Sequence, residues 1–187
     1  MRIVFFGPNG SGKGTQADLL KNELKVPHIS TGDLLRAAVK AATPLGVKAK
    51  EVMAAGQLVS DEIVLGMLEE RLGEPDAVNG FILDGYPRNL AQCGALEALL
   101  ARIGQPLDIA IKLDVPDASI LARCELRFKA EHRPDDDPVI VRKRLDIYRE
   151  QTAPVAEHFE QIGKLAHVDG VGTVDEVFQR ILAALPR

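Results

Sequence analysis

A glycine-rich segment that contains a lysine directly follows the first apolar run of the chain. Residues 7–16 read GPNGSGKGTQ and precede a helical pattern, expected over Ala17 to Leu24. Glycines let the backbone curl so that successive N–H groups point at one anion, and the dipole of the following helix attracts the same charge. Lys13 adds a mobile positive charge for terminal phosphates. Because Gly14 follows Lys13, the strict GxxxxGK[ST] pattern is not met, and a plain glycine-rich turn is the alternative.

An aspartate, Asp84, stands at the end of another apolar run, Phe81–Leu83. A carboxylate at a strand end beside a phosphate loop is where nucleotide enzymes hold Mg²⁺, directly or through water. Taken alone, an aspartate at this position is equally typical of a turn. Beside the phosphate loop we favour the metal role.

These residues must be positioned by a sheet, and short apolar runs supply its candidate strands. The runs are Ile3–Phe6, Pro27–Ile29, Phe81–Leu83, Ile109–Leu113 and Leu165–Val168. Most of them lack polar alternation, which is typical of strands buried on both faces. Helical patterns separate the runs, and this alternation predicts an α/β fold with a parallel sheet and helices on both faces.

Two regions break the alternation. Residues 30–60 hold only helical patterns and loops, and residues 123–149 are rich in arginine, with eight basic against six acidic side chains. We expect both regions as insertions at the carboxyl edge of the sheet, where ligands bind in open α/β folds. Ser30, Ser60 and Thr173 supply signals for helix starts.

The composition argues against several classes of function. The 187 residues suit one domain, and 23 basic against 27 acidic side chains give a net charge of −4. That charge, with no tryptophan in the chain, argues against nucleic acid as a partner. No apolar stretch approaches the roughly 20 residues that span a bilayer, and no targeting segment is evident. We expect Cys93 and Cys124 as buried apolar residues of a cytoplasmic protein.

Several further motifs, taken together with GKGTQ, resemble the adenylate kinases. They are STGDLLR at 30–36, DGYPR at 84–88, Gln92, Arg133 with Asp135 and Asp136, RKRLDIY at 142–148 and QTAP at 151–154, in order along essentially the whole chain. The resemblance implies a P-loop kinase fold, with one domain over residues 1–187 and a five-stranded parallel sheet. It also implies two closing segments, a monophosphate-binding segment at 30–59 and a short lid at 126–136 without a zinc site.

The activity implied by the resemblance is reversible, Mg²⁺-dependent transfer of the terminal phosphate of ATP to AMP, giving two ADP. Because the chain is long enough to fold alone, we expect a monomer. Phosphoryl transfer needs positioning and the stabilisation of spread negative charge, and planar guanidinium groups can bridge oxygens of both phosphate groups. The catalytic residues implied are Lys13, Arg88, Arg123, Arg127, Arg133 and Arg144. Asp135 and Asp136 are implied to position the lid arginines, with a solvated acidic turn as the alternative.

The resemblance divides the remaining contacts between two nucleotides. For ATP it implies Gly10, Ser11, Gly12, Lys13, Gly14, Thr15, Arg127 and Gly172. For AMP it implies Thr31, Arg36, Gln57, Leu58, Val59, Gly85, Tyr86, Pro87, Arg88, Gln92, Arg133 and Arg144. Asp84 is implied to hold Mg²⁺ through water.

The choice of acceptor depends on Gln92, whose amide can donate to and accept from the Watson–Crick edge of adenine. A UMP/CMP kinase of the same family is the alternative within this class, since its equivalent residue is typically Asn. A different class, a non-catalytic nucleotide-dependent switch, needs no arginine set for a second phosphate group. Four residues depart from the family pattern and leave the lid conformation open, namely Asn9, Phe128, His132 and Pro134.

Overall fold

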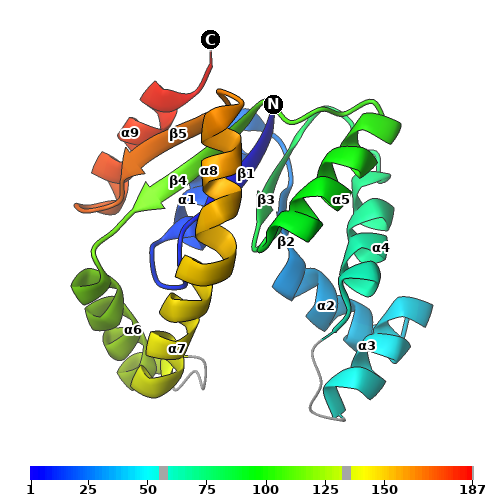
Figure 1. The fold of residues 1–187 in the computed structure, drawn as a ribbon, viewed down its shortest axis with the longest axis horizontal. Helices are drawn as coiled ribbons and strands as arrows, with labels where there is room; N and C mark the ends of the chain where they lie inside the picture. Colours follow the sequence, from blue (N-terminus) through cyan, green and yellow to red (C-terminus); the bar gives the residue numbers. More distant parts are fainter. Residues whose placement is uncertain (55–58, 132–135, 187) are drawn as a thin grey trace.

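The computed structural model describes residues 1–54, 59–131 and 136–186. At its centre lies a parallel sheet with the strand order β2-β3-β1-β4-β5 (Figure 1). The strands are β1 (Arg2–Phe6), β2 (His28–Ser30), β3 (Phe81–Asp84), β4 (Ile109–Asp114) and β5 (Leu165–Asp169). The predicted α/β fold is confirmed, and each of the five predicted strands forms.

The strands form where apolar side chains are buried on both faces of the sheet. In β1, Val4 and Phe6 belong to one hydrophobic cluster, while Ile3 and Phe5 belong to the cluster on the opposite face. The register then positions the polar strand ends, because Asp84 of β3 lies opposite Phe5 of β1 and Ser30 of β2. The carboxylate of Asp84 therefore stands at the carboxyl edge of the sheet, next to the loop that follows β1.

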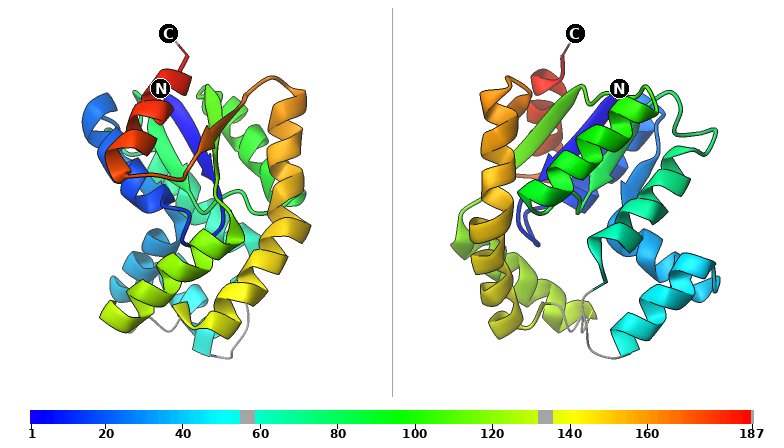
Figure 2. Two further views of the ribbon diagram at one scale, coloured as in Figure 1. Left: turned by 90° about the vertical axis from the view of Figure 1, so that its left-hand side faces the viewer. Right: turned by 45° about the vertical axis from the view of Figure 1, so that its right-hand side comes forward.

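Helices cover both faces of the sheet (Figure 2). They are α1 (Lys13–Leu24), α2 (Thr31–Lys40), α3 (Pro44–Ala54), α4 (Asp61–Leu72), α5 (Leu90–Arg102), α6 (Asp117–Glu131), α7 (Pro138–Ile147), the π-helical turn η2 (Tyr148–Thr152), α8 (Ala153–Gln161) and α9 (Val174–Ala184). Side chains of α1 and α9 fill the core on one face, and side chains of α4, α5 and α8 fill the core on the other.

The first helix begins earlier than the sequence predicted. We expected it from Ala17, but α1 starts at Lys13, so that the last residues of the glycine-rich segment form its first turn. Gly12 makes this possible, because it occupies the N-cap position with a left-handed φ of 99° that residues with a Cβ rarely adopt. The predicted capping box at Thr173 and Glu176 is confirmed at the start of α9.

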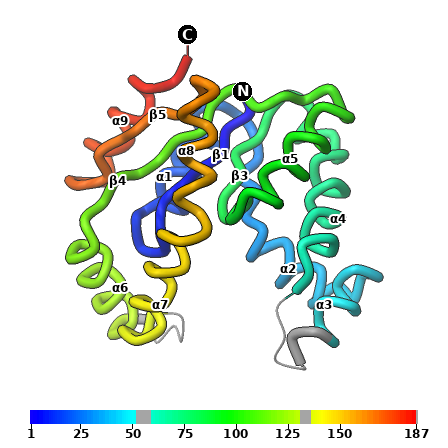
Figure 3. The backbone as a smooth tube through the Cα atoms, viewed as in Figure 1, coloured from blue at the N-terminus to red at the C-terminus, as the bar shows by residue number. Residues whose placement is uncertain are grey.

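Two helical regions extend from the carboxyl edge of the sheet. Helices α2 and α3 lie on one side and helices α6 and α7 on the other, as the backbone trace shows (Figure 3). Residues 30–54 contain no strand beyond the end of β2, as predicted for the first insertion. Among the described residues, no helix is both long and apolar enough to cross a membrane.

Candidate active site

The glycine-rich loop is shaped by positions that accept no side chain. Gly10 and Gly12 have φ values of 87° and 99°, and a Cβ on Gly10 would stand 2.6 Å from the sulfur of Cys124. The amide of Ser11 donates to the carbonyl of Pro8 at 3.1 Å, which closes the turn. The Ser11 hydroxyl is buried and has no protein partner within the part of the chain that the structure describes. The loop can therefore present several polar groups to one anion.

Lys13 projects from the first turn of α1 into a region of strong positive potential. Its Nζ donates to the carbonyl of Pro8 at 3.0 Å and lies 4.0 Å from the carboxylate of Asp84. Burial lowers the pKa of Lys13. The carboxylate of Asp84 opposes that shift, but the charges of Arg88 and Arg127 add to it. Three cations from separate elements thus converge beside one carboxylate.

Asp84 carries a negative charge that two neighbouring groups stabilise. Burial alone would raise its pKa, but His28 and the charge of Lys13 outweigh burial and hold the pKa below its ordinary value. His28 Nε2 lies 3.8 Å from the Asp84 carboxylate, a distance that makes the contact an ion pair rather than a hydrogen bond. An ionised carboxylate beside a phosphate loop fits the hard oxygen ligands that Mg²⁺ prefers.

His28 lies between two carboxylates, which sequence reasoning did not foresee. Its Nδ1 is 3.1 Å from the Asp18 carboxylate, and its Nε2 faces Asp84. Burial by itself lowers the pKa of His28. The two carboxylates raise the pKa by more than burial lowers it, so that the net shift is upward. The predicted strand at Pro27–Ile29 contains His28, but its pairing with β3, which brings His28 close to Asp84, was not predicted.

The predicted AMP residues Thr31, Gly85, Arg88 and Gln92 come together where β3 leads into α5. Arg88 Nε and the Thr31 hydroxyl both donate to the carbonyl of Gly85, at 2.7 Å and 3.2 Å. The Arg88 amide donates to Gln92 Oε1 at 2.7 Å. Gln92 Nε2 in turn donates to the carboxylate of Asp61 at 2.6 Å. Asp61, the first residue of α4, is a neighbour that the motifs did not reveal.

The loop between β3 and α5 is held from two further directions. Tyr86 is buried and joined to Pro87 by a cis peptide bond, and burial chiefly raises the pKa of its hydroxyl to about 12. The hydroxyl of Thr152 in η2 donates to the carbonyl of Arg88 at 2.8 Å. The pKa of Arg88 is lowered by desolvation and by the nearby charge of Arg144, so that Arg144 of α7 belongs to the same positive region.

Two arginines of α6 make different kinds of contact: Arg123 contacts loops of the core, and Arg127 pairs within the expected lid segment. Arg123 donates to the carbonyls of Ser11 and Gly170, at 3.1 Å and 2.9 Å, and so joins the phosphate loop to the loop after β5. Arg127 forms a bidentate pair with Asp136 at 2.5 Å and 2.6 Å, and the Asp136 side chain is 0% exposed. This geometry favours the positioning role for Asp136 over a solvated turn.

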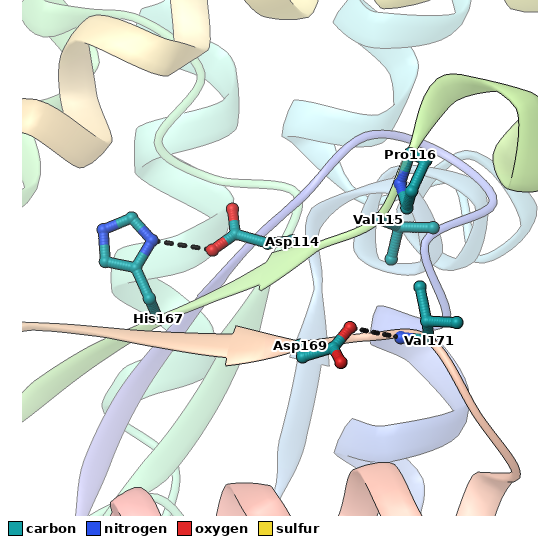
Figure 4. Close-up of a pocket in the computed structure, with 6 residues that line it drawn as sticks. All are labelled: Asp114, Val115, Pro116, His167, Asp169 and Val171. Atoms are coloured by element: carbon teal, nitrogen blue, oxygen red, sulfur yellow. Dashed lines mark hydrogen bonds and ion pairs between the residues drawn. The ribbon is translucent and has the colours of Figure 1, made fainter.

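The loop after β5 contains Gly172, the expected contact for the ATP base. Gly172 has a φ of 128°, and a Cβ there would stand 2.7 Å from the Glu176 carboxylate that caps α9. Its neighbour Val171 lines a hollow of about 460 Å³ together with Asp114 and His167 (Figure 4). Two of the lining residues, Asp114 and His167, form a 2.7 Å hydrogen bond with each other (Figure 4).

Some of the predicted site residues do not lie in this region. Arg36 lies on α2 with its side chain 71% exposed and pairs with Asp33 at 2.5 Å. Thr15 is exposed on α1, and Val59 is partly exposed before α4. Three predicted site residues lie outside the described residues: Gln57, Leu58 and Arg133.

Comparison with known proteins gives a consistent result. A sequence model described as adenylate kinase matches residues 5–164 of the chain. The chain is 64% identical to an adenylate kinase of Xanthomonas campestris pv. campestris (strain B100) over 187 residues, which is 100% of both chains. It is 58% identical to an adenylate kinase of Xylella fastidiosa (strain 9a5c) over 185 residues, which is 99% of each.

Proposed function

This chain belongs to the adenylate kinase family, the ATP:AMP phosphotransferases, and we propose that its residues divide the reaction between a donor side and an acceptor side. The observation that carries the proposal is the convergence of cations from four elements. The positive charges of Arg88 and Arg127 lower the pKa of Lys13, and the positive charge of Arg144 lowers the pKa of Arg88. Cations that repel one another are stabilised together by a polyanion, such as two phosphate chains brought end to end.

On the donor side, the phosphate loop holds the triphosphate of ATP. The backbone amides of residues 10–15 and the dipole of α1 face the phosphates, and Lys13 contributes the charge nearest the transferred group. Arg123 fixes the loop against the segment after β5, where Gly172 contacts the base. Arg127 reaches the donor phosphates from α6.

On the acceptor side, Arg36, Arg88, Arg133 and Arg144 bind the phosphate of AMP. The nucleoside lies against Thr31, residues 57–59 and the loop of Gly85, Tyr86 and Pro87. Gln92 reads the adenine. Its amide is already oriented, because Oε1 accepts from the Arg88 amide while Nε2 donates to Asp61. Each of these two atoms retains capacity for one further hydrogen bond, so that the same amide can accept from and donate to adenine.

The chemistry needs no side chain to remove a proton, because the attacking group is a phosphate that is already anionic. The task of the protein is to hold the two phosphate groups in line and to neutralise the charge between them. Asp84 is suited to hold Mg²⁺ through water, and the ion supplies further neutralisation of the phosphate oxygens. Segments 30–59 and 126–136 exclude water by closing over the nucleotides.

A coupled assay with AMP, CMP, UMP and GMP as acceptors tests the assignment. We expect AMP to be preferred, and we expect Gln92→Asn to lower kcat/KM for AMP about tenfold, because the shorter amide loses its fixed orientation. The exposed Gln161→Asn on α8 is the matched control and should leave all four activities unchanged. A preference for CMP or UMP would contradict the AMP assignment and identify a pyrimidine kinase.

Calorimetry separates a kinase from a nucleotide-dependent switch. A kinase binds a mimic that joins two adenosines through a phosphate chain, and one mimic then occupies both sides of the site. A switch binds a single nucleotide and gains nothing from the second adenosine. We also propose a monomer in the cytoplasm, a compartment that suits the two free, buried cysteines. Sedimentation and cell fractionation test these two points.

A further inference from the structure

Three side chains of metal-binding types meet between α5 and α8, in a cluster that the reaction does not use. Cys93 and Glu97 lie on α5 and His158 lies on α8, and their candidate ligand atoms are all within 4.8 Å of one another. We propose that these three residues form a binding site for Zn²⁺ or a divalent cation of similar softness. The cluster is separate from the lid, where the resemblance to the family led us to expect no zinc site.

The two helices place these residues at a suitable spacing. Cys93 and Glu97 are four residues apart in α5, so that both project from one face of the helix. His158 Nε2 already stands 3.1 Å from Glu97 Oε1. Ligand atoms about 2.0–2.3 Å from a tetrahedral Zn²⁺ lie about 3.3–3.7 Å from one another. The three ligand atoms would therefore have to approach one another only a little to bind the ion.

The side chains that must move are the ones with freedom to do so. The Glu97 and His158 side chains are 42% and 34% exposed, whereas Cys93 is buried in the core. An ion can therefore enter from the solvent side past Glu97 and His158 and meet the thiol at the base of the site. Three protein ligands leave a fourth position for water, the arrangement of an open zinc site.

The donor set favours one class of ion. A thiolate and an imidazole are ligands for Zn²⁺ and Co²⁺, whereas Mg²⁺ requires hard oxygen ligands.

Two other residues of metal-binding types, one cysteine and one histidine, provide matched controls. Cys124 is also free and buried, but its sulfur faces the carbonyl of Asn9 at 3.9 Å. His167 also lies near two carboxylates, at 2.7 Å from Asp114 and 3.8 Å from Glu160. Neither Cys124 nor His167 belongs to a group of three metal-binding side chains among the described residues.

The test is a titration of the nucleotide-free, chelator-treated chain with Co²⁺, followed by absorbance. We expect one equivalent of Co²⁺ to bind with a thiolate-to-metal charge-transfer band in the near ultraviolet. Zn²⁺ should abolish the band at one equivalent, and excess Mg²⁺ should not. Cys93→Ser should remove the band, while His158→Ala and Glu97→Gln should weaken Co²⁺ binding at least about tenfold. Cys124→Ser and His167→Ala should leave the spectrum and affinity unchanged.

Absence of a charge-transfer band in the wild-type chain would overturn the proposal, and so would a band that persists in Cys93→Ser. Loss of the band in Cys124→Ser alone would move the site elsewhere and also overturn it. Circular dichroism verifies that each variant is folded. Should Cys93→Ser fail to fold, the partly exposed substitutions decide, and unchanged affinity in both His158→Ala and Glu97→Gln contradicts the site.

Discussion

The cations of the core and those of the two inserted regions are held in different ways. In the core, Lys13 and Arg88 donate to backbone carbonyls, those of Pro8 and Gly85. In the inserted regions, Arg36 and Arg127 donate to carboxylates, those of Asp33 and Asp136. A carbonyl orients a cation without cancelling its charge, whereas a carboxylate does both.

This difference separates two tasks. The core cations repel one another, and the Asp84 carboxylate lies 4.0 Å from Lys13 without a hydrogen bond to it, so we expect them to keep more of their positive charge for the phosphate chain proposed above. A carboxylate-paired arginine must exchange its partner before it can bind a phosphate, so that its contribution depends on the arrival of the nucleotide. The predictions below test whether the two groups behave in this way.

The largest expected effect follows from removing a core cation. Lys13→Met should lower kcat/KM about 10²- to 10³-fold, because charge that develops in the transition state loses its nearest donor. The fold should persist, since Lys13 Nζ makes one hydrogen bond within the described part of the chain, to the Pro8 carbonyl. Steady-state kinetics and circular dichroism measure the two quantities. Lys21→Met on the exposed side of α1 is the control, and near-wild-type turnover in a folded Lys13→Met variant would contradict the role.

The next effect concerns stability in the lid region. Asp136→Asn should lower the free energy of unfolding by about 2 kcal/mol, because it weakens a bidentate pair whose carboxylate is fully buried. Urea titration measures the change. Glu125→Gln is the control, because Glu125 is an exposed partner of Lys129 on α6, the helix that also carries Arg127. This substitution should leave the midpoint of urea unfolding unchanged. Equal midpoints for wild type and Asp136→Asn would mean that this pair does not hold the region together.

The free energy of unfolding should depend on pH through the protonation of His28. The folded pKa of His28 lies above its ordinary value of 6.5, so that the protonated imidazole stabilises the fold below that pH. This contribution is lost as pH rises through the folded pKa. The free energy of unfolding of wild type, measured in metal-free buffer, should therefore fall relative to that of His28→Gln over this range. Parallel pH profiles for the two proteins would show that His28 does not interact with Asp18 and Asp84.

The smallest effect is expected at the exposed pair of α2. Asp33→Asn should change the free energy of unfolding by less than about 0.5 kcal/mol, because both side chains are more than 70% exposed. It should lower the KM for AMP about twofold, since Arg36 no longer has to leave a carboxylate. Initial rates over a range of AMP concentrations measure this. A raised KM would mean that Asp33 positions Arg36 rather than competing for it.

The strands could be predicted because each is a short, mostly apolar run that stands between helical patterns. Ile109–Leu113 and Leu165–Val168 differ from the observed β4 and β5 only by the polar residue at the end of each strand. The start of α1 was predicted late, because Gly12 and Gly14 argue against a helix by propensity. Here Gly12 instead supplies the left-handed N-cap from which the helix begins.

The site was predictable only where one motif carries several of its residues. GKGTQ and DGYPR contain Lys13, Asp84 and Arg88, and the structure brings Lys13 Nζ to 4.0 Å from the Asp84 carboxylate, as expected for an aspartate beside the phosphate loop. His28 with Asp84 and Asp61 with Gln92 are separated by 56 and 31 residues, and neither pair belongs to one pattern. Such contacts depend on strand order and helix packing, which local spacing does not encode. The same holds for Cys93, Glu97 and His158, since His158 comes from a helix 61 residues beyond Glu97.

The anchored amide of Gln92 has a consequence for purines with a different ring substituent. Asp61 can only accept from Nε2 and the Arg88 amide can only donate to Oε1, so that the amide cannot rotate end for end without losing both bonds. Guanine and hypoxanthine present a carbonyl at C6 and an N–H at position 1, the reverse of adenine. Against the fixed amide, two acceptors would face each other and two donors would face each other. With Gln92 against the acceptor base, as proposed above, we expect the polarity of this one side chain to reject deaminated and guanine nucleotides of nearly the same shape as AMP.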